Sequence, residues 1–447
     1  MPTDPAPQRG RLRGILLDVD PLRRDRDFRF LWIGQIISGV GRQVTVVALP
    51  FQLYVLTGST LAVGLLALVQ LVPILAFALG GGAVADAVDR RRLLLITQLG
   101  LAGAAGSLFL LASSPTAPIW GYYVVAFVAA GLGAVDQPAR SSAVPRLVPR
   151  ERLPAAIALN QLGFQVMAVA GPALGGILIA WVGVAAAFAF DAVTFAAAIV
   201  ALLLIAPIPP HPGAARPSLA TVKEGLRFVR RRRIILSTFV IDFVAMVFGM
   251  PTSLFPALAL DVFGVGAAGL GLMAAAPAAG ALVGATLTGW VGGIQRPGRA
   301  VIVAVAAWGL AITAFGLSTW SFALALVFLA LAGAADVISA VLRSAIVQLE
   351  TPDEIRGRVI GVHILVVTSG PRLGDAEAAA VAAVAGPQFS VVSGGILCLV
   401  GLAEVVRRFP ELRAYVYPAP KSSEPVAATE DGPETKPETV PDTVTSP

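Results

Sequence analysis

Twelve long apolar runs alternate with short polar connections along this chain of 447 residues. Each run holds roughly 20 residues, which is the length that a helix needs to cross the hydrocarbon core of a membrane. Lipid offers no hydrogen bonds to backbone groups, so segments of this kind cross as helices. The runs cover residues 29–56, 61–85, 92–112, 119–138, 155–180, 184–206, 234–259, 266–291, 298–317, 321–342, 358–384 and 387–408. The pattern predicts an all-α integral membrane protein with twelve transmembrane helices.

Basic residues mark one side of the predicted spans. All but two of the 33 Lys and Arg residues lie in the terminal segments or in every second connection. Short connections rich in Lys and Arg stay in the cytoplasm, so we expect both termini to be cytoplasmic. The two exceptions, Arg42 and Arg372, lie near the middle of the first and the eleventh span.

The composition agrees with this placement and argues against other classes of protein. Hydrophobic residues make up 56% of the chain and charged residues 13%, whereas about a quarter of a soluble protein is charged. The net charge of +6 comes from arginines that flank the spans, so it orients the protein and does not indicate nucleic-acid binding. The single cysteine, Cys398, excludes an intramolecular disulfide or a thiolate metal cluster. Without a metal, nucleophile or nucleotide motif, we expect no cofactor and no enzymatic activity.

The longest basic connection divides the chain into two halves. Its last part is basic and amphipathic, and is expected to form a helix along the inner membrane surface. Gly133-Ala-Val-Asp136 recurs in the second half as Gly333-Ala-Ala-Asp336, which indicates duplication. The expected organisation is a cytoplasmic tail at 1–27, a six-helix bundle at 28–206, the linker at 207–233, a second six-helix bundle at 234–409 and a disordered cytoplasmic tail at 410–447.

Polar residues on one face of the first span predict a water-accessible cavity. A charged residue at the centre of a membrane helix costs about 2.5–3.5 kcal/mol on the insertion scale, so it persists where a partner or water compensates. The face is formed by residues at three- and four-residue steps, namely Gln35, Ser38, Arg42, Thr45 and Gln52. The pattern leaves open whether Arg42 contacts an anionic ligand or a neighbouring aspartate.

The second half contains charged residues that can face the same cavity. In span eleven Arg372 and Asp375 are three residues apart and can pair, whereas Glu377 points away from Asp375 because two residues turn a helix by about 200°. Asp242 in span seven can face the cavity from the opposite half. Asp242, Asp375 and Glu377 are the candidate proton carriers.

Other charged residues lie nearer to the span ends. Asp136 and Arg140 are four residues apart, and Asp336 and Arg343 are two helical turns apart. Both pairs are expected to be structural or to act in gating at the cytoplasmic ends. Asp191 lies near the outer end of span six.

Three groups of residues have spacings that occur together in one transporter superfamily. The first is Gly82, Asp86, Arg90 and Arg91, with Ala87 and Asp89 as departures; the second is Gly163, Gly171, Pro172, Gly175 and Gly176; the third runs from Asp136 to Asn160 and recurs in part at 351–358. With these residues the chain, over about residues 28–409, resembles the major facilitator superfamily. Within it, the chain is similar to bacterial efflux proteins typified by the enterobactin (siderophore) exporter and by drug efflux permeases.

This resemblance implies a multi-pass protein of the bacterial cytoplasmic membrane that exports a small amphipathic molecule by proton antiport with alternating access. It implies an inner gate latch at Asp86, Arg90 and Arg91, an antiporter-like motif in the fifth span, and a place for Asn160 on the substrate and proton pathway. The expected partners are a small-molecule substrate, a siderophore or a drug-like compound, together with protons and membrane lipid; the chain is expected to be a monomer. Proton-coupled import of a metabolite and a non-transporting membrane scaffold are the alternatives.

Overall fold

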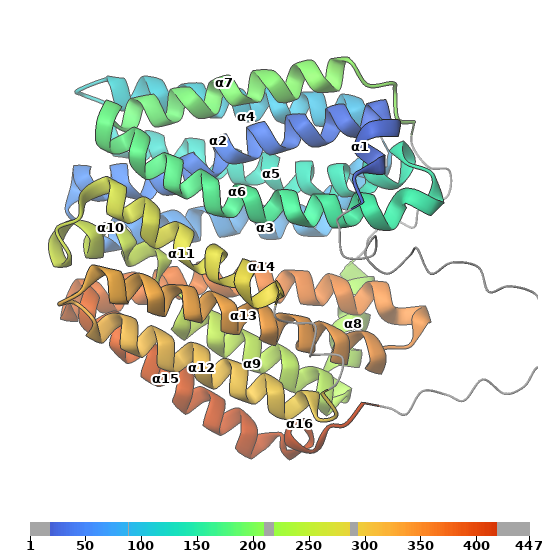
Figure 1. Ribbon diagram of the computed structural model, residues 1–447, viewed down its shortest axis with the longest axis vertical. Coiled ribbons are helices and arrows are strands. Elements are labelled where there is room, and N and C mark those ends of the chain that lie inside the picture. Colours follow the sequence, from blue (N-terminus) through green and yellow to red (C-terminus); the bar gives the residue numbers. More distant parts are fainter. Residues whose placement is uncertain (1–17, 88, 210–218, 287–293, 418–447) are drawn as a thin grey trace, which may run out of the picture.

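The computed structural model describes residues 18–87, 89–209, 219–286 and 294–417, without the side chains of 78–87 and 219–222. The described residues form helices and connections. The first bundle consists of α2 (Arg26–Thr57), α3 (Thr60–Ala87), α4 (Arg90–Ser113), α5 (Ile119–Leu147), α6 (Leu153–Val182) and α7 (Val184–Leu203). The second consists of α9 (Arg233–Gly249), α11 (Gly266–Thr286), α12 (Pro297–Leu317), α13 (Phe322–Glu350), α14 (Asp353–Ala385) and α15 (Pro387–Arg408). The two bundles lie one above the other in Figure 1.

Among the described residues, twelve helical segments have the length to cross a membrane when α9 is counted together with the short helices that continue it to Val262, and the predicted fold class is confirmed. Eleven of them, among the described residues, are also apolar enough by composition. α14 is the twelfth; it has 33 residues but carries four charged side chains beyond its first turn. It packs against α3 of the first bundle and against α9 and α15 of the second.

The seventh predicted span is not one continuous helix. α9 ends at Gly249, and the chain continues through the 3-10 helix η2 (Thr252–Leu254), α10 (Phe255–Ala257) and the π-helical turn η3 (Leu258–Val262). Pro251 explains the break, because the residue before a proline is disfavoured in helical conformation and proline has no N–H to donate.

The short elements outside the bundles change two predicted boundaries. A helix, α1 (Asp20–Arg24), lies within the predicted N-terminal tail. The prediction that the chain is disordered from residue 410 is wrong for α16 (Pro410–Ala414), which buries Leu412 and is held by an ion pair of 2.6 Å from Glu411 to Arg233. Disorder in 418–447 was also predicted, but that segment lies outside the described residues.

The linker contains the helix α8 (Leu219–Arg231), in the stretch where a basic amphipathic helix is expected. It packs on α14 and α9 of the second bundle. Val229 is buried against Val359 and Val362, and Glu224 makes an ion pair of 2.6 Å with Arg358. One face of α8 therefore rests on protein.

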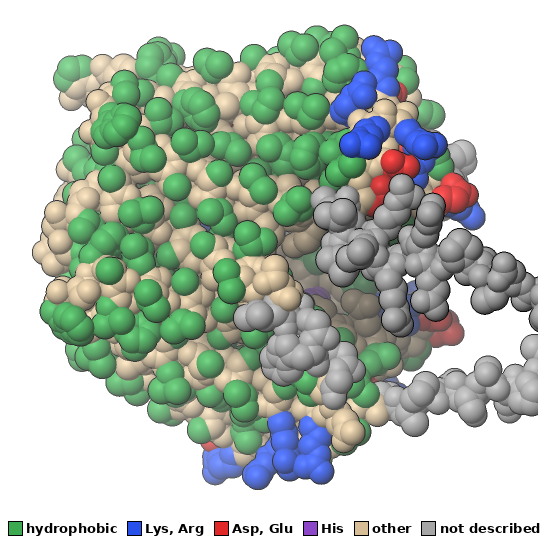
Figure 2. All heavy atoms as spheres, viewed as in Figure 1, with side chains coloured by type: hydrophobic (Ala, Val, Ile, Leu, Met, Phe, Trp, Pro, Cys, Tyr) green, Lys and Arg blue, Asp and Glu red, His purple; other side chains and the backbone are tan. Residues whose placement is uncertain are grey.

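The bundles share one apolar core at one end and have separate cores at the other. We call the end that holds the Arg-rich connections the basic end. The largest cluster of buried residues joins both bundles at the opposite end and includes Val44, Leu49, Leu258 and Met273. At the basic end each bundle has a cluster of its own, such as that around Phe28 and that around Leu402. A hollow opens between the bundles at the basic end, where Lys and Arg side chains also gather (Figure 2).

Candidate functional site

Buried charged residues form one cluster in each bundle. In the first bundle Asp136 of α5 is 1% exposed and has a full set of donors. Thr97 Oγ1 and Gln98 Nε2 of α4 each donate to Asp136 Oδ1 at 2.8 Å, and Arg140 Nη2 lies 3.2 Å from Asp136 Oδ2. The i,i+4 pair expected from the sequence is therefore formed. It ties α5 to α4.

Arg42 of α2 lies beside this pair without joining it. Its guanidinium is half-buried and makes no hydrogen bond and no ion pair within 4 Å in the described part of the chain. Its electrostatic neighbours are Asp136 and Asp191, which attract it, and Arg140, which repels it. The charge of Arg42, near the middle of the predicted span, is thus compensated by carboxylates that do not contact it directly.

Asp191 of α7 belongs to the same cluster. Its position near the outer end of predicted span six did not indicate this. Thr45 Oγ1 donates to Asp191 Oδ2 at 2.6 Å, while Asp191 Oδ1 is buried without a hydrogen-bond partner. Gly41 allows this approach, because a Cβ there would meet Asp191 Oδ1 at 2.8 Å. The contact joins residues 146 positions apart, so no local pattern could have revealed it.

The polar face predicted on the first span is therefore divided between tasks. Thr45 binds Asp191, Gln52 Nε2 donates to Tyr122 Oη of α5 at 3.3 Å, and Ser38 is 3% exposed. Thr45 and Gln52 therefore link α2 to α7 and α5, and the buried Ser38 does not line an open cavity. Gln35, Arg42, Thr45 and Gln52 are half-exposed, so their place along a cavity stays a prediction.

In the second bundle a single arginine faces two carboxylates. Arg343 Nη2 of α13 lies 2.7 Å from Asp242 Oδ1 of α9 and 3.9 Å from Asp336 Oδ1 of its own helix. Asp242 is 3% exposed and its Oδ2 is buried without a partner, whereas the side chain of Asp336 is 37% exposed. The prediction that Asp242 faces a cavity is wrong, because Arg343 holds it inside the bundle. The predicted Asp336–Arg343 pair is the weaker of the two contacts.

His363 of α14 is the other titratable group next to this cluster. Its ring stacks on Phe239 of α9 with 5.4 Å between ring centroids, and it lies within electrostatic range of Asp242 and Arg343. Three helices, α9, α13 and α14, therefore bring these groups together.

The three-residue spacing suggested that Asp375 of α14 pairs with Arg372, but the structure shows other partners. Thr252 Oγ1 and the Ser253 backbone N–H donate to Asp375 Oδ1 at 2.6 and 2.7 Å, and Ser253 Oγ donates to the Asp375 carbonyl at 2.8 Å. The carboxylate thus caps the 3-10 helix η2 after the break in the seventh span, as an acidic group stabilises a helix N-terminus. Arg372 and Glu377 are half-buried, and neither makes a hydrogen bond or an ion pair within the described residues.

We therefore expect Asp375→Asn to be as stable as the parent and Asp375→Ala to unfold more easily. The asparagine Oδ1 can accept the same two bonds, whereas alanine leaves the donors of Thr252 and Ser253 unsatisfied at a cost of about 3 kcal/mol. Melting temperatures of the two purified variants check this. An Asp375→Asn variant that melts as low as Asp375→Ala would show that the two bonds to Oδ1 do not account for the stability.

The glycine-proline motif of α6 brings helix backbones close together. A Cβ at Gly171 would meet Gln43, one at Gly175 would lie 3.2 Å from Val44 Cα, and one at Gly163 would meet Ile36, all on α2. Gly176 faces the other bundle, where its Cβ would lie 2.8 Å from Gly271 Cα and 2.6 Å from the Ala267 carbonyl oxygen of α11. We call this close contact of α6 with α11 the seam between the bundles. Pro172 belongs to it, since a Cβ at Gly271 would lie 2.6 Å from the Pro172 carbonyl oxygen.

Two hydrogen bonds also join the bundles at the end opposite the basic end. Tyr54 Oη of α2 donates to Asp261 Oδ2 of η3. Thr60 Oγ1 of α3 donates to the Ala379 carbonyl of α14 at 3.1 Å. Both bonds link the bundles opposite the basic end, and the sequence motifs did not single out these residues.

The two arginines of the predicted inner gate contact the first bundle, and Arg90 also donates to the Pro209 carbonyl of the linker at 3.3 Å. Arg90 Nε donates to Ser142 Oγ at 2.9 Å, and Arg91 donates to the carbonyls of Leu202 and Leu203 at 2.8 Å each. The surroundings of Gly82 and the side chain of Asp86 lie outside what the structure describes, so the predicted latch stays a prediction. Asn160, near the basic end of α6, is half-buried. No group of three or more His, Cys, Asp or Glu is placed to hold a metal ion within the described residues.

Comparison with known proteins gives the same architecture. The sequence profile of a family described as transmembrane secretion effector matches residues 18–433. The enterobactin exporter EntS of Citrobacter koseri is 30% identical over 416 residues, which cover 91% of this chain and 97% of that protein. The EntS of Shigella boydii serotype 18 is 29% identical over 411 residues, or 88% and 96% of the two chains.

Solved structures of transporters share the fold at low sequence identity. A POT family transporter in complex with 5-aminolevulinic acid superposes with a TM-score of 0.68 at 14% identity, covering 87% of this chain and 97% of that one. A bacterial homologue of the iron transporter ferroportin, in an inward-facing state, gives 0.67 at 15% identity over 87% and 99%. At these identities the likeness concerns the fold alone.

Proposed function

The chain belongs to the transmembrane secretion effector family of the major facilitator superfamily, and from this premise we propose that it exports a small amphipathic molecule by proton antiport with alternating access. It is a multi-pass efflux transporter of the bacterial inner membrane rather than an enzyme. Its substrate in this proposal is a siderophore or a drug-like compound. The names of the two relatives described above, both enterobactin exporters, support export over the import alternative.

The observation that carries the proton coupling is the charge imbalance between the two clusters. In the first bundle Arg42 and Arg140 balance Asp136 and Asp191. In the second, Arg343 alone faces Asp242 and Asp336, which leaves one surplus negative charge. A proton would neutralise that charge, and the half-exposed Asp336 is the carboxylate that water can reach.

The proposed cycle starts from the state described above, with both termini in the cytoplasm. The bundles meet through a common core opposite the basic end, and the hollow at the basic end admits substrate from the cytoplasm. Arg42, which has no direct ion pair within the described residues, is proposed to contact an anionic or polar group of the substrate. Protonation of Asp336 changes the partners of Arg343, and the two states then differ in free energy, as a population shift requires.

The test uses everted membrane vesicles, whose lumen corresponds to the outside of the cell. With an acidic lumen, a siderophore or a fluorescent drug should accumulate inside, and nigericin should abolish the accumulation. Each proton charge that moves through the membrane potential supplies about 2.3 kcal/mol per 100 mV. Asp336→Asn should keep downhill movement of substrate but lose its response to the gradient, whereas the exposed Asp353→Asn should behave as the parent. Accumulation that persists after the gradient collapses would refute proton antiport.

A further inference from the structure

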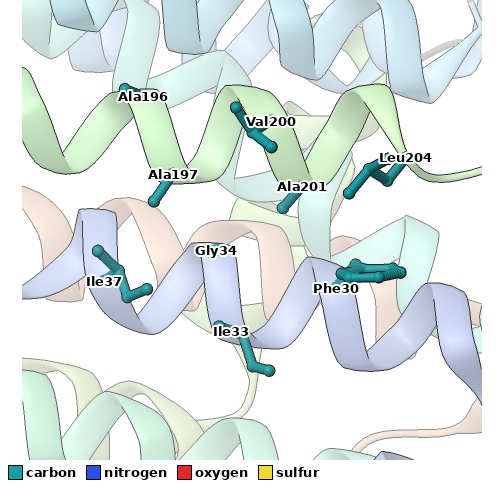
Figure 3. Close-up of a pocket in the computed structure, with 9 residues that line it drawn as sticks. All are labelled: Phe30, Ile33, Gly34, Ile37, Ala196, Ala197, Val200, Ala201 and Leu204. Atoms are coloured by element: carbon teal, nitrogen blue, oxygen red, sulfur yellow. The ribbon is translucent and has the colours of Figure 1, made fainter.

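An apolar groove of about 370 Å³ runs between α2 and α7 on the outside of the first bundle. Figure 3 shows Phe30 and Leu204 at one end of it, and Ile37 and Ala196 toward the other. Gly34 forms its floor, where a Cβ would lie 2.8 Å from the Cβ of Ala201. Such a groove forms because the two helices touch at small residues and carry larger side chains on either side of the contact.

The groove faces lipid and not the hollow between the bundles. Ile37 is five residues from Arg42, so the two lie about 140° apart around α2. The walls stay open: Ile37 is 40% exposed and Val200 55%. From Phe30 to Ile37 the groove covers about 10 Å along α2, against about 15 Å for half of the hydrocarbon core. It therefore lies within the leaflet at the basic end.

Cationic groups surround the end of the groove that reaches the membrane surface. The guanidinium carbons of Arg26 and Arg29 lie 5.4 and 5.8 Å from the centroid of the Phe30 ring. Arg91 holds the carbonyls of Leu202 and Leu203 at the same end of α7. Two acidic side chains flank Arg26 in the sequence: Asp27 accepts from the Ala206 N–H at 3.2 Å, and Asp25 pairs with Arg152 at 2.9 Å. The Asp25–Arg152 pair cancels, so Arg26, Arg29 and Arg91 with Asp27 leave a net charge of about +2 here.

We infer that this groove binds an acyl chain of an anionic phospholipid whose phosphate is held by Arg26 and Arg29. Both halves of the site match such a lipid, since the groove is apolar and its membrane-surface end is basic. A basic residue near an anionic membrane surface contributes about 1 kcal/mol. A second copy of the chain fits less well, because it would bring the same arginines against each other. The inference needs only the membrane placement and does not depend on the proposed transport cycle.

The test is photo-crosslinking in nanodiscs that contain phosphatidylglycerol with a diazirine on one acyl chain, or phosphatidylcholine with the same label. We expect phosphatidylglycerol to label peptides of α2 and α7. Arg26→Gln with Arg29→Gln should lower that labelling by about 25-fold and leave the phosphatidylcholine signal unchanged. Ala197→Phe should block labelling by both lipids, because Ala197 points into the space between the helices (Figure 3).

Val193→Phe is the matched control, since Val193 is 70% exposed on the same helix outside the groove. It should label as the parent does, and melting temperatures confirm that each variant is folded. Equal labelling by the two lipids, labelling of Ala197→Phe at the parent level, or crosslinks between two copies of the chain at α2 and α7 would each overturn the inference.

Discussion

Replacing Arg343 with methionine is expected to cost about 3–5 kcal/mol of the free energy of unfolding and to abolish export. Arg343 is 5% exposed and is the counter-ion of Asp242 at 2.7 Å. Without it the buried Asp242 would keep a charge that nothing nearby compensates. Cys398 is the only cysteine and is fully buried, so a thiol-reactive fluorescent dye reports unfolding of the purified protein directly.

A double variant separates stability from function in this cluster. Asp242→Asn together with Arg343→Met removes both charges, and the loss of a whole buried pair is often neutral for stability. The double variant should melt near the parent temperature and still fail to respond to a pH gradient. Arg356→Met is the control, because its ion pair with Asp353 is exposed and should contribute at most about 1 kcal/mol. Parent-like melting of Arg343→Met alone would contradict the assigned role.

Gly176→Val is expected to open the seam between the bundles and to reduce export about tenfold or more. Its side chain would meet the backbone of α11, at Ala267 and Gly271, which cannot move aside as a flexible side chain would. Overpacking of this kind costs about 1–3 kcal/mol, which shifts a two-state equilibrium about 5- to 150-fold. The state with the seam closed loses that free energy, whereas the packing inside each bundle is unchanged.

The reporter for this prediction is a cysteine at Thr60, which is 8% exposed and binds the Ala379 carbonyl where α3 and α14 join the same two bundles. In detergent, Thr60→Cys should react with a maleimide faster when Gly176→Val is also present. Gly103→Val is the matched control, since a Cβ at Gly103 meets no atom within 4 Å. If Gly176→Val reacts and exports as Gly103→Val does, the seam does not limit the transport cycle.

Charges inside the spans were recognised from the sequence, but their partners were not. Helical spacing identified Asp136 with Arg140 because four residues bring two side chains to one face of a helix. The same reasoning predicted that Asp336 pairs with Arg343 and Arg372 with Asp375. In the structure Arg343 binds Asp242 of another helix more closely, and Asp375 binds the start of η2. Spacing within a helix says nothing about which other helix lies beside it.

The amino-acid sequence by itself determined the all-α membrane fold, its division into halves and the positions of the costly charges. Hydropathy, helical period and the placement of arginines are properties of short segments, so they can be found without knowing any distant contact. Only the tertiary structure decided that Asp191 meets Thr45, that the glycines of α6 serve two different neighbours, and that the bundles meet at one end. Those features depend on how helices far apart in the chain pack together, and packing is a property of the whole assembly.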